Sequence, residues 1–312
     1  MKTLFTILIF CIVLFIYIHI NFHLKISNDL EVYEIEQPSK EKLEEICDIR
    51  QPVIFDYNVD GLLNDCNIDS IERNYGAFDV KVRNVKEYDD VCELYLPLTL
   101  NTTREIFRKD TEQRFVSENN ADFLEETGLV KTMRYNDNFL RPYSVCNCNY
   151  DIHFSSSETK TPLKYDLNYR NFYMVSQGSI KIKLIPPKSS KYLYTIKDYD
   201  NFEFLSPVNP WDTQSQFKAD FDKLKTLEVE LKKGQIIYIP AYWWYSFHYA
   251  ENSSLCVFKY NTYMNNIAIS NHLLVSMLQN QNVKREIAKK INLDGNNIPE
   301  KADTSENEKK EE

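Results

Sequence analysis

Two short segments contain the side chains that could do chemistry. Residues 161–166 read Thr-Pro-Leu-Lys-Tyr-Asp, and residues 234–245 end in Pro-Ala-Tyr-Trp-Trp-Tyr. Residues two apart on a strand share a face, so we expect the Lys164 ammonium to lie beside the Asp166 carboxylate and supply its counter-charge. An ammonium has no lone pair for a metal, and a neutral phenol such as that of Tyr245 is a poor metal ligand. These residue types therefore predict no metal site at these positions.

The two segments resemble those of the cupin-like JmjC family of Fe(II)- and 2-oxoglutarate-dependent oxygenases. In that family they read T-P-L-H-x-D and G-D-x-x-x-I-P-x-x-W-W-H, and the two histidines and the aspartate hold Fe(II). Asp166 matches the carboxylate ligand, whereas Lys164 and Tyr245 stand at the two histidine positions. The resemblance thus implies a degenerate metal site at Lys164, Asp166 and Tyr245, with no catalytic residue and no bound metal. Restoring both histidines is expected to recover metal binding.

Other segments follow the family's order of parts from about residue 38 to residue 261. Residues 51–54 match its opening strand, residues 140–142 the segment before the barrel, and residues 178–187 the strand that ends in L-x-P-P. Within the family, the chain is most similar to the asparaginyl hydroxylase that acts on hypoxia-inducible factor. This ordered set is evidence for the fold and only an analogy for function.

The resemblance also implies where a cosubstrate or another anion would bind. Thr161 matches a threonine that contacts 2-oxoglutarate, and Asn261 lies where the family's late V-N strand ends. The lysine that pairs with the distal carboxylate is expected at the position of Ile180, and Lys181 comes one residue later. Such a shift turns a side chain to the opposite face unless a bulge restores it. Thr161, Lys164, Lys181 and Asn261 are the candidate contacts of this pocket.

Three other histidines could supply metal ligands outside the N-terminal run. His248 lies an odd number of residues after Tyr245 and should face away from it, whereas His153 is the one that could enter the barrel from a neighbouring strand. His272 belongs to the C-terminal helical segment. We interpret all three as ordinary packed or surface histidines.

The elements that must position these side chains are mostly strands. Apolar or alternating runs predict strands at residues 52–55, 78–83, 172–175, 180–185, 227–231, 235–239 and 255–260. Helical patterns cover residues 39–49, 103–128 and 266–291. The predicted fold is a mostly β double-stranded β-helix of the jelly-roll or cupin type, with flanking helices and an N-terminal transmembrane helix.

The N-terminus carries a continuous apolar run at residues 4–20. As a helix it would be about 26 Å long, enough for a thin bilayer. A cleaved signal peptide is the competing interpretation, but the chain has no Ala before Ala77 and no Gly before Gly61 to form a cleavage site. We therefore predict a single-pass signal anchor, with a cytoplasmic N-terminus and the domain in a lumen or on a virion surface.

The predicted organisation has five parts. These are an anchor at 1–22, a polar stalk at 23–38, the cupin-like JmjC domain at 39–265, a C-terminal helical segment at 266–294 and a disordered charged tail at 295–312. The formal net charge of −9 argues against nucleic-acid binding. Asn far outnumbers Ala and Gly, a bias typical of A/T-rich genomes such as those of giant viruses.

Cysteines and sequons fit an exterior domain. Cys47, Cys66, Cys92, Cys146, Cys148 and Cys256 form an even set that permits disulfides, although reduced thiols remain an equal alternative. Asn101 and Asn252 begin N-x-S/T sequons and are the candidate glycosylation sites.

The sequence leads to three hypotheses. The first is a membrane-anchored, catalytically inactive cupin-like JmjC domain with a binding or structural role and no cofactor. The second is a divergent hydroxylase that uses Fe(II) and 2-oxoglutarate, and the third is an anion binder that uses the old cosubstrate pocket. The membrane is the expected partner, with a protein partner or a homodimer through the C-terminal helix as a further expectation.

Overall fold

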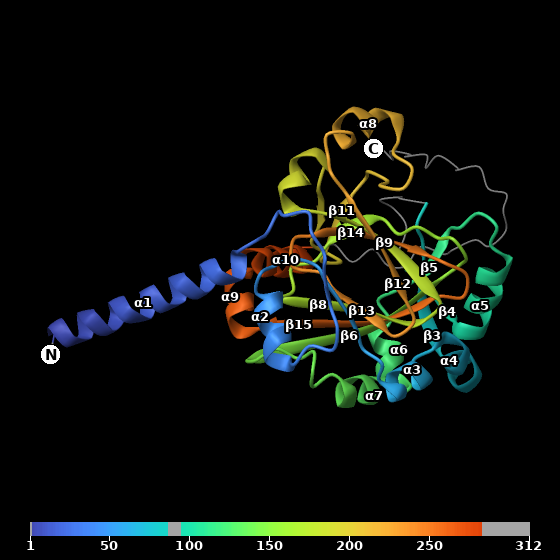
Figure 1. Cartoon of the computed structure of the whole chain (residues 1–312), viewed down its shortest axis with the longest axis horizontal. Helices are drawn as coiled ribbons and strands as arrows, with labels where there is room; N and C mark the ends of the chain where they lie inside the picture. Colours follow the sequence, from blue (N-terminus) through green and yellow to red (C-terminus); the bar gives the residue numbers. More distant parts are fainter. Residues whose placement is uncertain (1, 87–94, 283–312) are drawn as a thin grey trace, which may run out of the picture.

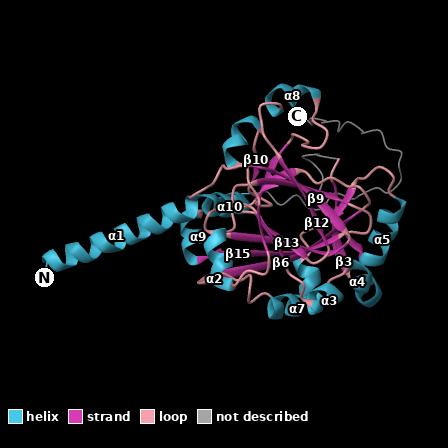
Figure 2. Ribbon diagram, in the orientation of Figure 1, coloured by secondary structure: helices cyan, strands magenta, loops and turns pink. Residues whose placement is uncertain are grey.

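The computed structural model of the chain describes residues 2–86 and 95–282. Within them the strands form two facing sheets, of nine and six strands, with short helices around the outside (Figure 2). The nine-stranded sheet runs, in spatial order, β1 (Tyr33–Ile35), β2 (Val53–Asp56), β13 (Gln235–Tyr238), β8 (Arg170–Gln177), β15 (Ser254–Thr262), β6 (Val145–Ser155), β5 (Phe115–Ser117), β3 (Asp79–Asn84) and β4 (Leu96–Thr99). The six-stranded sheet runs β10 (Ile196–Asp198), β11 (Glu203–Ser206), β7 (Leu163–Tyr165), β14 (Trp244–Tyr249), β9 (Ser179–Ile185) and β12 (Leu227–Lys232).

From β6 onward the chain crosses repeatedly between the two sheets, with β9 to β12 all in the smaller one, and this winding makes the double-stranded β-helix. Strands β6, β8, β13 and β15 lie in the larger sheet, while β7, β9, β12 and β14 lie in the smaller one. Every named strand pair is antiparallel except β1 with β2. The predicted fold class is confirmed.

Helices flank the sheets and precede or follow them in the chain (Figure 1). Their bounds are α1 Lys2–Leu24, α2 Lys40–Cys47, α3 Asp60–Asp65, α4 Ile68–Tyr75, α5 Leu100–Lys109, α6 Ala121–Glu126, α7 Leu129–Asn136, the 3₁₀ helix η1 Pro187–Tyr192, α8 Ser215–Phe221, α9 Tyr263–Ala268 and α10 Ser270–Asn282. The predicted cap at Ser39 is present, since its hydroxyl accepts the backbone N–H of Lys42 at 3.2 Å.

Each face of the larger sheet packs against a different hydrophobic core, which explains the long apolar runs in its strands. On β8, Phe172 and Met174 pack into a core beneath the helices, while Tyr173 and Val175 face the interior between the sheets. Strands buried on both faces read as continuous apolar sequence. The interior between the sheets is the place where side chains from both can meet.

Two predicted elements differ in the structure. Residues 103–128 contain strand β5 between α5 and α6, because Asp110 ends α5 and caps the following loop by accepting the N–H groups of Glu112 and Arg114 at 3.0 and 2.7 Å. Part of the expected stalk is strand β1, whose last residue Ile35 packs against one core, while Val32 just before the strand packs against the other. Two apolar residues three apart among acidic ones gave no strand pattern in the sequence.

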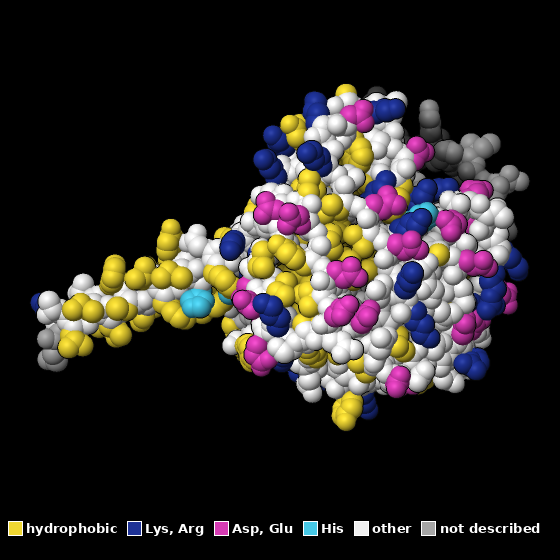
Figure 3. Space-filling view, viewed as in Figure 1, with side chains coloured by type: hydrophobic (Ala, Val, Ile, Leu, Met, Phe, Trp, Pro, Cys, Tyr) yellow, Lys and Arg dark blue, Asp and Glu magenta, His cyan; other side chains and the backbone are white. Residues whose placement is uncertain are grey.

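Helix α1 projects from the domain, and its surface is apolar along most of its length (Figure 3). It is long and apolar enough to cross a membrane, with a mean hydropathy of 2.6, and a signal sequence would have the same properties. Its last turn is docked on the domain, where the His23 Nε2 lies 3.1 Å from the Thr262 Oγ1 and the His23 ring 4.9 Å from that of Tyr169.

The predicted C-terminal helix at 266–291 is two helices, α9 and α10, which meet at Ile269. The remainder of that segment, and the tail expected at 295–312, lie outside the described residues. The described cysteines carry free thiols, and Cys47, Cys66 and Cys256 are buried. Cys92 also falls outside the described residues.

Candidate site between the two sheets

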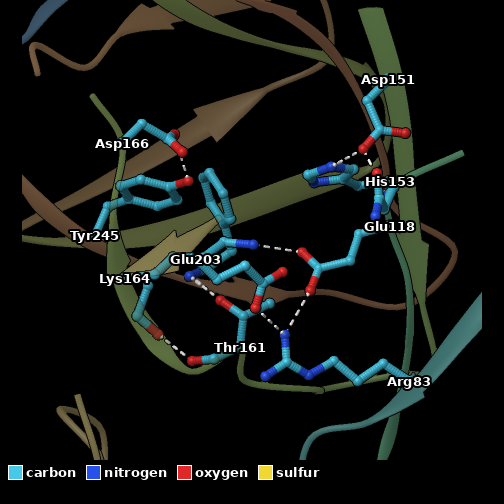
Figure 4. Close-up of polar contacts among 12 residues, drawn as sticks. Arg83, Glu118, Asp151, His153, Thr161, Lys164, Asp166, Glu203 and Tyr245 are labelled. Atoms are coloured by element: carbon cyan, nitrogen blue, oxygen red, sulfur yellow. Dashed lines mark hydrogen bonds and ion pairs between the residues drawn. The ribbon is translucent and has the colours of Figure 1, made fainter. Parts of the chain in front are cut away.

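The structure brings Asp166 and Tyr245 together in the interior between the sheets (Figure 4). Strand β14 pairs with β7 so that Tyr245 lies opposite Lys164, and Asp166 follows directly after β7. The Tyr245 hydroxyl donates to the Asp166 Oδ2 at 2.8 Å. Asp166 and Tyr245 are therefore in direct contact, and Lys164 is the register partner of Tyr245 on the neighbouring strand.

Asp166 takes its counter-charge from Lys259 on β15. The Lys259 ammonium lies 2.9 Å from Oδ1, and the Tyr173 hydroxyl donates to Oδ2 at 2.6 Å. Burial alone would raise the pKa of Asp166, but Lys259 and the Tyr173 hydrogen bond hold it below its usual value. The carboxylate is thus ionised, and both of its oxygens already have partners.

Lys164 pairs with Glu118 instead of Asp166, so the expected Lys164–Asp166 ion pair is wrong. Its ammonium lies 2.6 Å from Glu118, whose side chain is 3% exposed. The physical reason is that Asp166 lies beyond the end of β7, where strand alternation no longer holds. Glu118 follows β5, the strand that the sequence pattern did not indicate.

The Lys164–Glu118 pair continues into a buried network of charges (Figure 4). Arg83 on β3 lies 3.2 Å from both Glu118 and Glu203. The Tyr95 hydroxyl donates to the same two carboxylates, at 3.2 and 2.8 Å. Burial alone would raise the pKa of Glu118, but the neighbouring cations, Lys164 foremost, hold it well below its usual value.

The residues present do not fit an Fe(II) centre, because two of the three ligand positions are protonated. Burial lowers the pKa of Lys164, but the Glu118 carboxylate more than reverses this and raises it above its usual value. Burial and the nearby Asp166 carboxylate raise the pKa of Tyr245 well above its usual value. An ammonium and a phenol leave Asp166 as the single ionised ligand, which Lys259 already neutralises.

The structure does not bring together the residues expected to line an anion or cosubstrate pocket. The Thr161 hydroxyl accepts the Phe247 N–H at 2.9 Å and thereby ties β7 to β14. Lys181 is exposed on β9, while Ile180 beside it is buried between the sheets. The Asn261 Oδ1 accepts N–H groups of Tyr169 and Asn265, at 3.3 and 2.9 Å. Lys181 thus points to the opposite face from Ile180, as expected for a shift of one residue along a strand, and it lies outside the site.

The three histidines have ordinary protein partners. His153 enters the interior from β6 and lies 2.8 Å from Asp151, which also accepts two backbone N–H groups. His248 lies 2.7 Å from Glu158 and faces away from Tyr245. His272 on α10 lies 3.1 Å from the Tyr199 hydroxyl.

Sequence reasoning missed Glu118, Arg83, Glu203, Tyr173 and Lys259 as parts of this site. Lys259 carried a signal, because it shares a strand face with Leu255 and Val257, which face the interior. A lysine at such a position needs a buried partner. Glu118 carried no such signal in the sequence, since its neighbours in the chain are polar and its partners come from other strands.

The two sequons have different surroundings. Asn101 is exposed in the first turn of α5. The Asn252 side chain donates to Asp69 at 3.3 Å and accepts from Arg104 at 2.7 Å. A glycan on Asn252 would have to replace these hydrogen bonds.

Comparison with known proteins gives two findings. The profile of a cupin-like domain matches residues 39–270 of the chain. The chain is also similar to HSPB1-associated protein 1 of mouse and of human, at 28% identity over 93 residues in each case. Those residues are 30% of this chain and 19% of the mouse protein, or 18% of the human one. The chain thus spans about a fifth of the length of these curated relatives.

Proposed function

The chain belongs to the cupin-like domain family, and on this premise we propose that it is a membrane-anchored cupin-like JmjC domain without catalytic activity, with a binding or structural role. The proposal rests on the side chains that occupy the positions of the family's metal ligands. The Lys164 ammonium and the Tyr245 phenol stand where the family has its metal-binding imidazoles, and both have internal partners. The opposing possibility is a divergent Fe(II)- and 2-oxoglutarate-dependent hydroxylase.

The balance of charge between the sheets supports the proposal. Lys164, Lys259 and Arg83 are matched by Glu118, Asp166 and Glu203, each within hydrogen-bond distance of a partner. Buried charges of this kind are tolerated when they are paired. The domain therefore needs no bound cation to neutralise Asp166. The anion-binding hypothesis loses its support, because Thr161, Lys181 and Asn261 do not converge.

The anchor is part of the proposal. Helix α1 contains the apolar run and begins at Lys2, so the positive end favours a cytoplasmic N-terminus and a lumenal or virion-surface domain. The name of the curated relatives records an association with HSPB1. The matched 93 residues cover too little of either chain to bring that partner into the proposal.

Iron content and turnover test this function. The full chain, purified in mild detergent and incubated with Fe(II) under argon, is expected to retain iron well below one per chain. It is also expected to consume no 2-oxoglutarate, while an active oxygenase assayed in parallel does. Iron near one per chain, or turnover above a boiled control, would support the hydroxylase instead.

Helix α10 offers the surface for a binding role. Its polar side faces the domain, where His272 and Ser276 hydrogen-bond to Tyr199 at 3.1 and 2.8 Å. Its apolar side faces outward, with exposed fractions from 39 to 58% at Leu273, Leu274, Val275, Met277 and Leu278. The helix carries no charged residue. Apolar, charge-free patches are typical of the centres of protein interfaces.

We propose a second copy of the chain as the occupant of this face. Leu274 and Leu278 lie one turn apart and can pack against the same pair of a two-fold partner. Two such faces would bury on the order of 1,000 Å², the lower limit for a specific interface. Copies held in one bilayer meet at high effective concentration, which compensates for a small interface.

Light scattering of the full chain in detergent tests the dimer. The protein mass is expected to be that of two chains, and a Leu274→Gln/Leu278→Gln variant should be a single chain. A Gln279→Ala/Gln281→Ala variant of the same helix is the matched control and should remain dimeric. A wild-type chain that is monomeric, or a variant as dimeric as the wild type, would contradict this interface.

A further inference from the structure

A groove of about 410 Å³ lies where α1 meets the domain. Its apolar wall comes from Leu24 and Ile26, at the end of α1 and just beyond it, and from Pro187 of η1. Its polar wall is formed by Tyr165 after β7, Tyr242 before β14 and Lys197 on β10. The residues that line it include no carboxylate.

The polar wall is a set of hydrogen-bond donors. The rings of Tyr165 and Tyr242 lie 6.2 Å apart. The Tyr165 ring is fixed by stacking 5.1 Å from Phe204 and by an edge contact 4.7 Å from Trp244. Within residues 2–86 and 95–282, neither phenol oxygen nor the Lys197 ammonium hydrogen-bonds to another protein group. Burial raises the pKa of both tyrosines, so both hydroxyls keep their protons.

The backbone around Tyr242 holds this arrangement in place. Tyr242 has a φ of 67°, in the left-handed region that a tyrosine seldom adopts. Its N–H donates to the Asp166 carbonyl at 2.9 Å, which keeps the turn against β7. Such strain is concentrated at sites that bind ligands.

The length of α1 sets the distance of the groove from the hydrocarbon layer of a bilayer. Leu24 comes four residues after Ile20, the end of the apolar run, so it lies about 6 Å beyond the hydrocarbon layer. The headgroup layer on each side of a bilayer is roughly 5–8 Å thick. Because the last turn of α1 is docked through His23 on Thr262, the groove stays at this level.

Three further lysines are chain neighbours of the lining residues. Lys25 lies between Leu24 and Ile26, and Lys188 and Lys191 follow lining residues of η1. The backbone N–H of Lys188 donates to the Asn28 Oδ1 at 2.7 Å, which joins η1 to the segment after α1. Figure 3 shows basic side chains gathered over the lobe that carries η1 and α8, beside the end of α1. Lysines at this level favour negatively charged headgroups.

We propose that this groove binds the headgroup phosphate of a phospholipid from the bilayer that α1 spans. The Tyr165 and Tyr242 hydroxyls and the Lys197 ammonium donate to the phosphate oxygens, and Leu24, Ile26 and Pro187 contact the glycerol and the first acyl carbons. This inference rests on the proposed anchor. It deepens the binding role by adding a lipid ligand away from the site between the sheets.

Native mass spectrometry of the delipidated full chain in detergent tests the groove. Titration with dioleoyl-phosphatidylserine is expected to give one saturable bound lipid, whereas dioleoylglycerol, which lacks the phosphate, should bind at least tenfold more weakly. A Tyr165→Phe/Tyr242→Phe/Lys197→Gln variant keeps the aromatic rings and should also lose at least tenfold in affinity. Lys181→Gln, an exposed lysine on β9, is the matched control and should bind as the wild type does.

Three outcomes would overturn the groove as a phospholipid site. The triple variant could bind phosphatidylserine as tightly as the wild type, or dioleoylglycerol could bind equally well. In the third, inorganic phosphate at the same concentration would displace the lipid, which would make this a site for free phosphate. An unchanged thermal midpoint of the triple variant shows that the loss of binding is not a loss of fold.

Alkaline carbonate extraction of membranes separates this inference from the anchor on which it rests. The wild-type chain should stay in the membrane pellet with Met1 or Lys2 at its N-terminus. A chain released into the supernatant overturns the anchor and, with it, the bilayer as the source of the lipid. A chain that stays in the pellet while the triple variant binds lipid normally overturns the groove alone.

Discussion

Replacing Lys164 with methionine is expected to lower the free energy of unfolding by roughly 3 kcal/mol, near the lower end of the range for breaking a buried ion pair. Methionine nearly preserves the volume of the lysine side chain but leaves the Glu118 carboxylate, 3% exposed, without its closest cation. Arg83, at 3.2 Å, still pairs with Glu118, which limits the loss. Urea denaturation of the full chain in detergent measures the change.

Two further variants identify the cause of that loss. Adding Glu118→Gln to Lys164→Met removes the uncompensated charge, so the double variant should recover about 1 kcal/mol or more of the loss. Lys181→Met removes an exposed lysine from neighbouring β9 and should change stability by no more than about 0.5 kcal/mol. If Lys164→Met matches Lys181→Met, the buried network does not contribute to stability as the geometry indicates.

The same pair gives a pH dependence with a defined sign. The pKa of Glu118 is lower in the folded protein than its usual value, so the pair stabilises the fold above the unfolded pKa of about 4.3. This stabilisation is lost as the pH falls toward the folded pKa. The difference in stability between the wild type and Lys164→Met should therefore narrow as the pH falls below about 4.3.

Tight metal binding is expected in a triple variant, Lys164→His/Tyr245→His/Lys259→Met. The two histidines supply the missing imidazoles, and Asp166 is already in position opposite them. The structure adds the third substitution, because the Lys259 ammonium at 2.9 Å would otherwise repel a cation from the only carboxylate ligand. Isothermal titration with Mn(II) or Zn(II) is expected to show saturable binding near one metal per chain for the triple variant.

The double variant with Lys259 retained is the control for this prediction. It should bind at least tenfold more weakly than the triple variant, and the wild type should show no saturable binding. Equal affinity of the double and triple variants would mean that Lys259 does not oppose the metal. Turnover is not expected in any of them, since Ile180 leaves the cosubstrate carboxylate without a cation.

The sequence predicted the strands whose apolar pattern is simple. Residues 172–175, 180–185 and 235–239 are strands in the structure because both of their faces, or one alternating face, are buried. Strand β6 was missed because Asp151 and His153, which hydrogen-bond to each other, alternate with its core residues. A polar inner face resembles a solvent-exposed one in a single sequence.

The candidate site was predicted in position but not in its contacts. Motif order placed Asp166 and Tyr245 side by side, and parity placed Lys181 outside. Glu118, the partner of Lys164, follows β5, and Lys259, the cationic partner of Asp166, lies on β15, so both are far from these residues in the chain. Long-range strand pairing determines which carboxylate pairs with a buried lysine, and no local sequence pattern predicts that partner.

The short strand β1 also determines how far the protein can reach. Fourteen flexible residues between α1 and residue 39 would allow the domain to sample a hemisphere with a radius of roughly 50 Å. Instead only eight residues separate Leu24 from β1, which is paired with β2, and His23 fixes the end of α1 to Thr262. With α1 in a bilayer, as proposed, the domain would turn and diffuse together with its anchor. Its search for partners would then be confined to the plane of the bilayer, and it would capture only those molecules that approach within one domain diameter of the lipid surface.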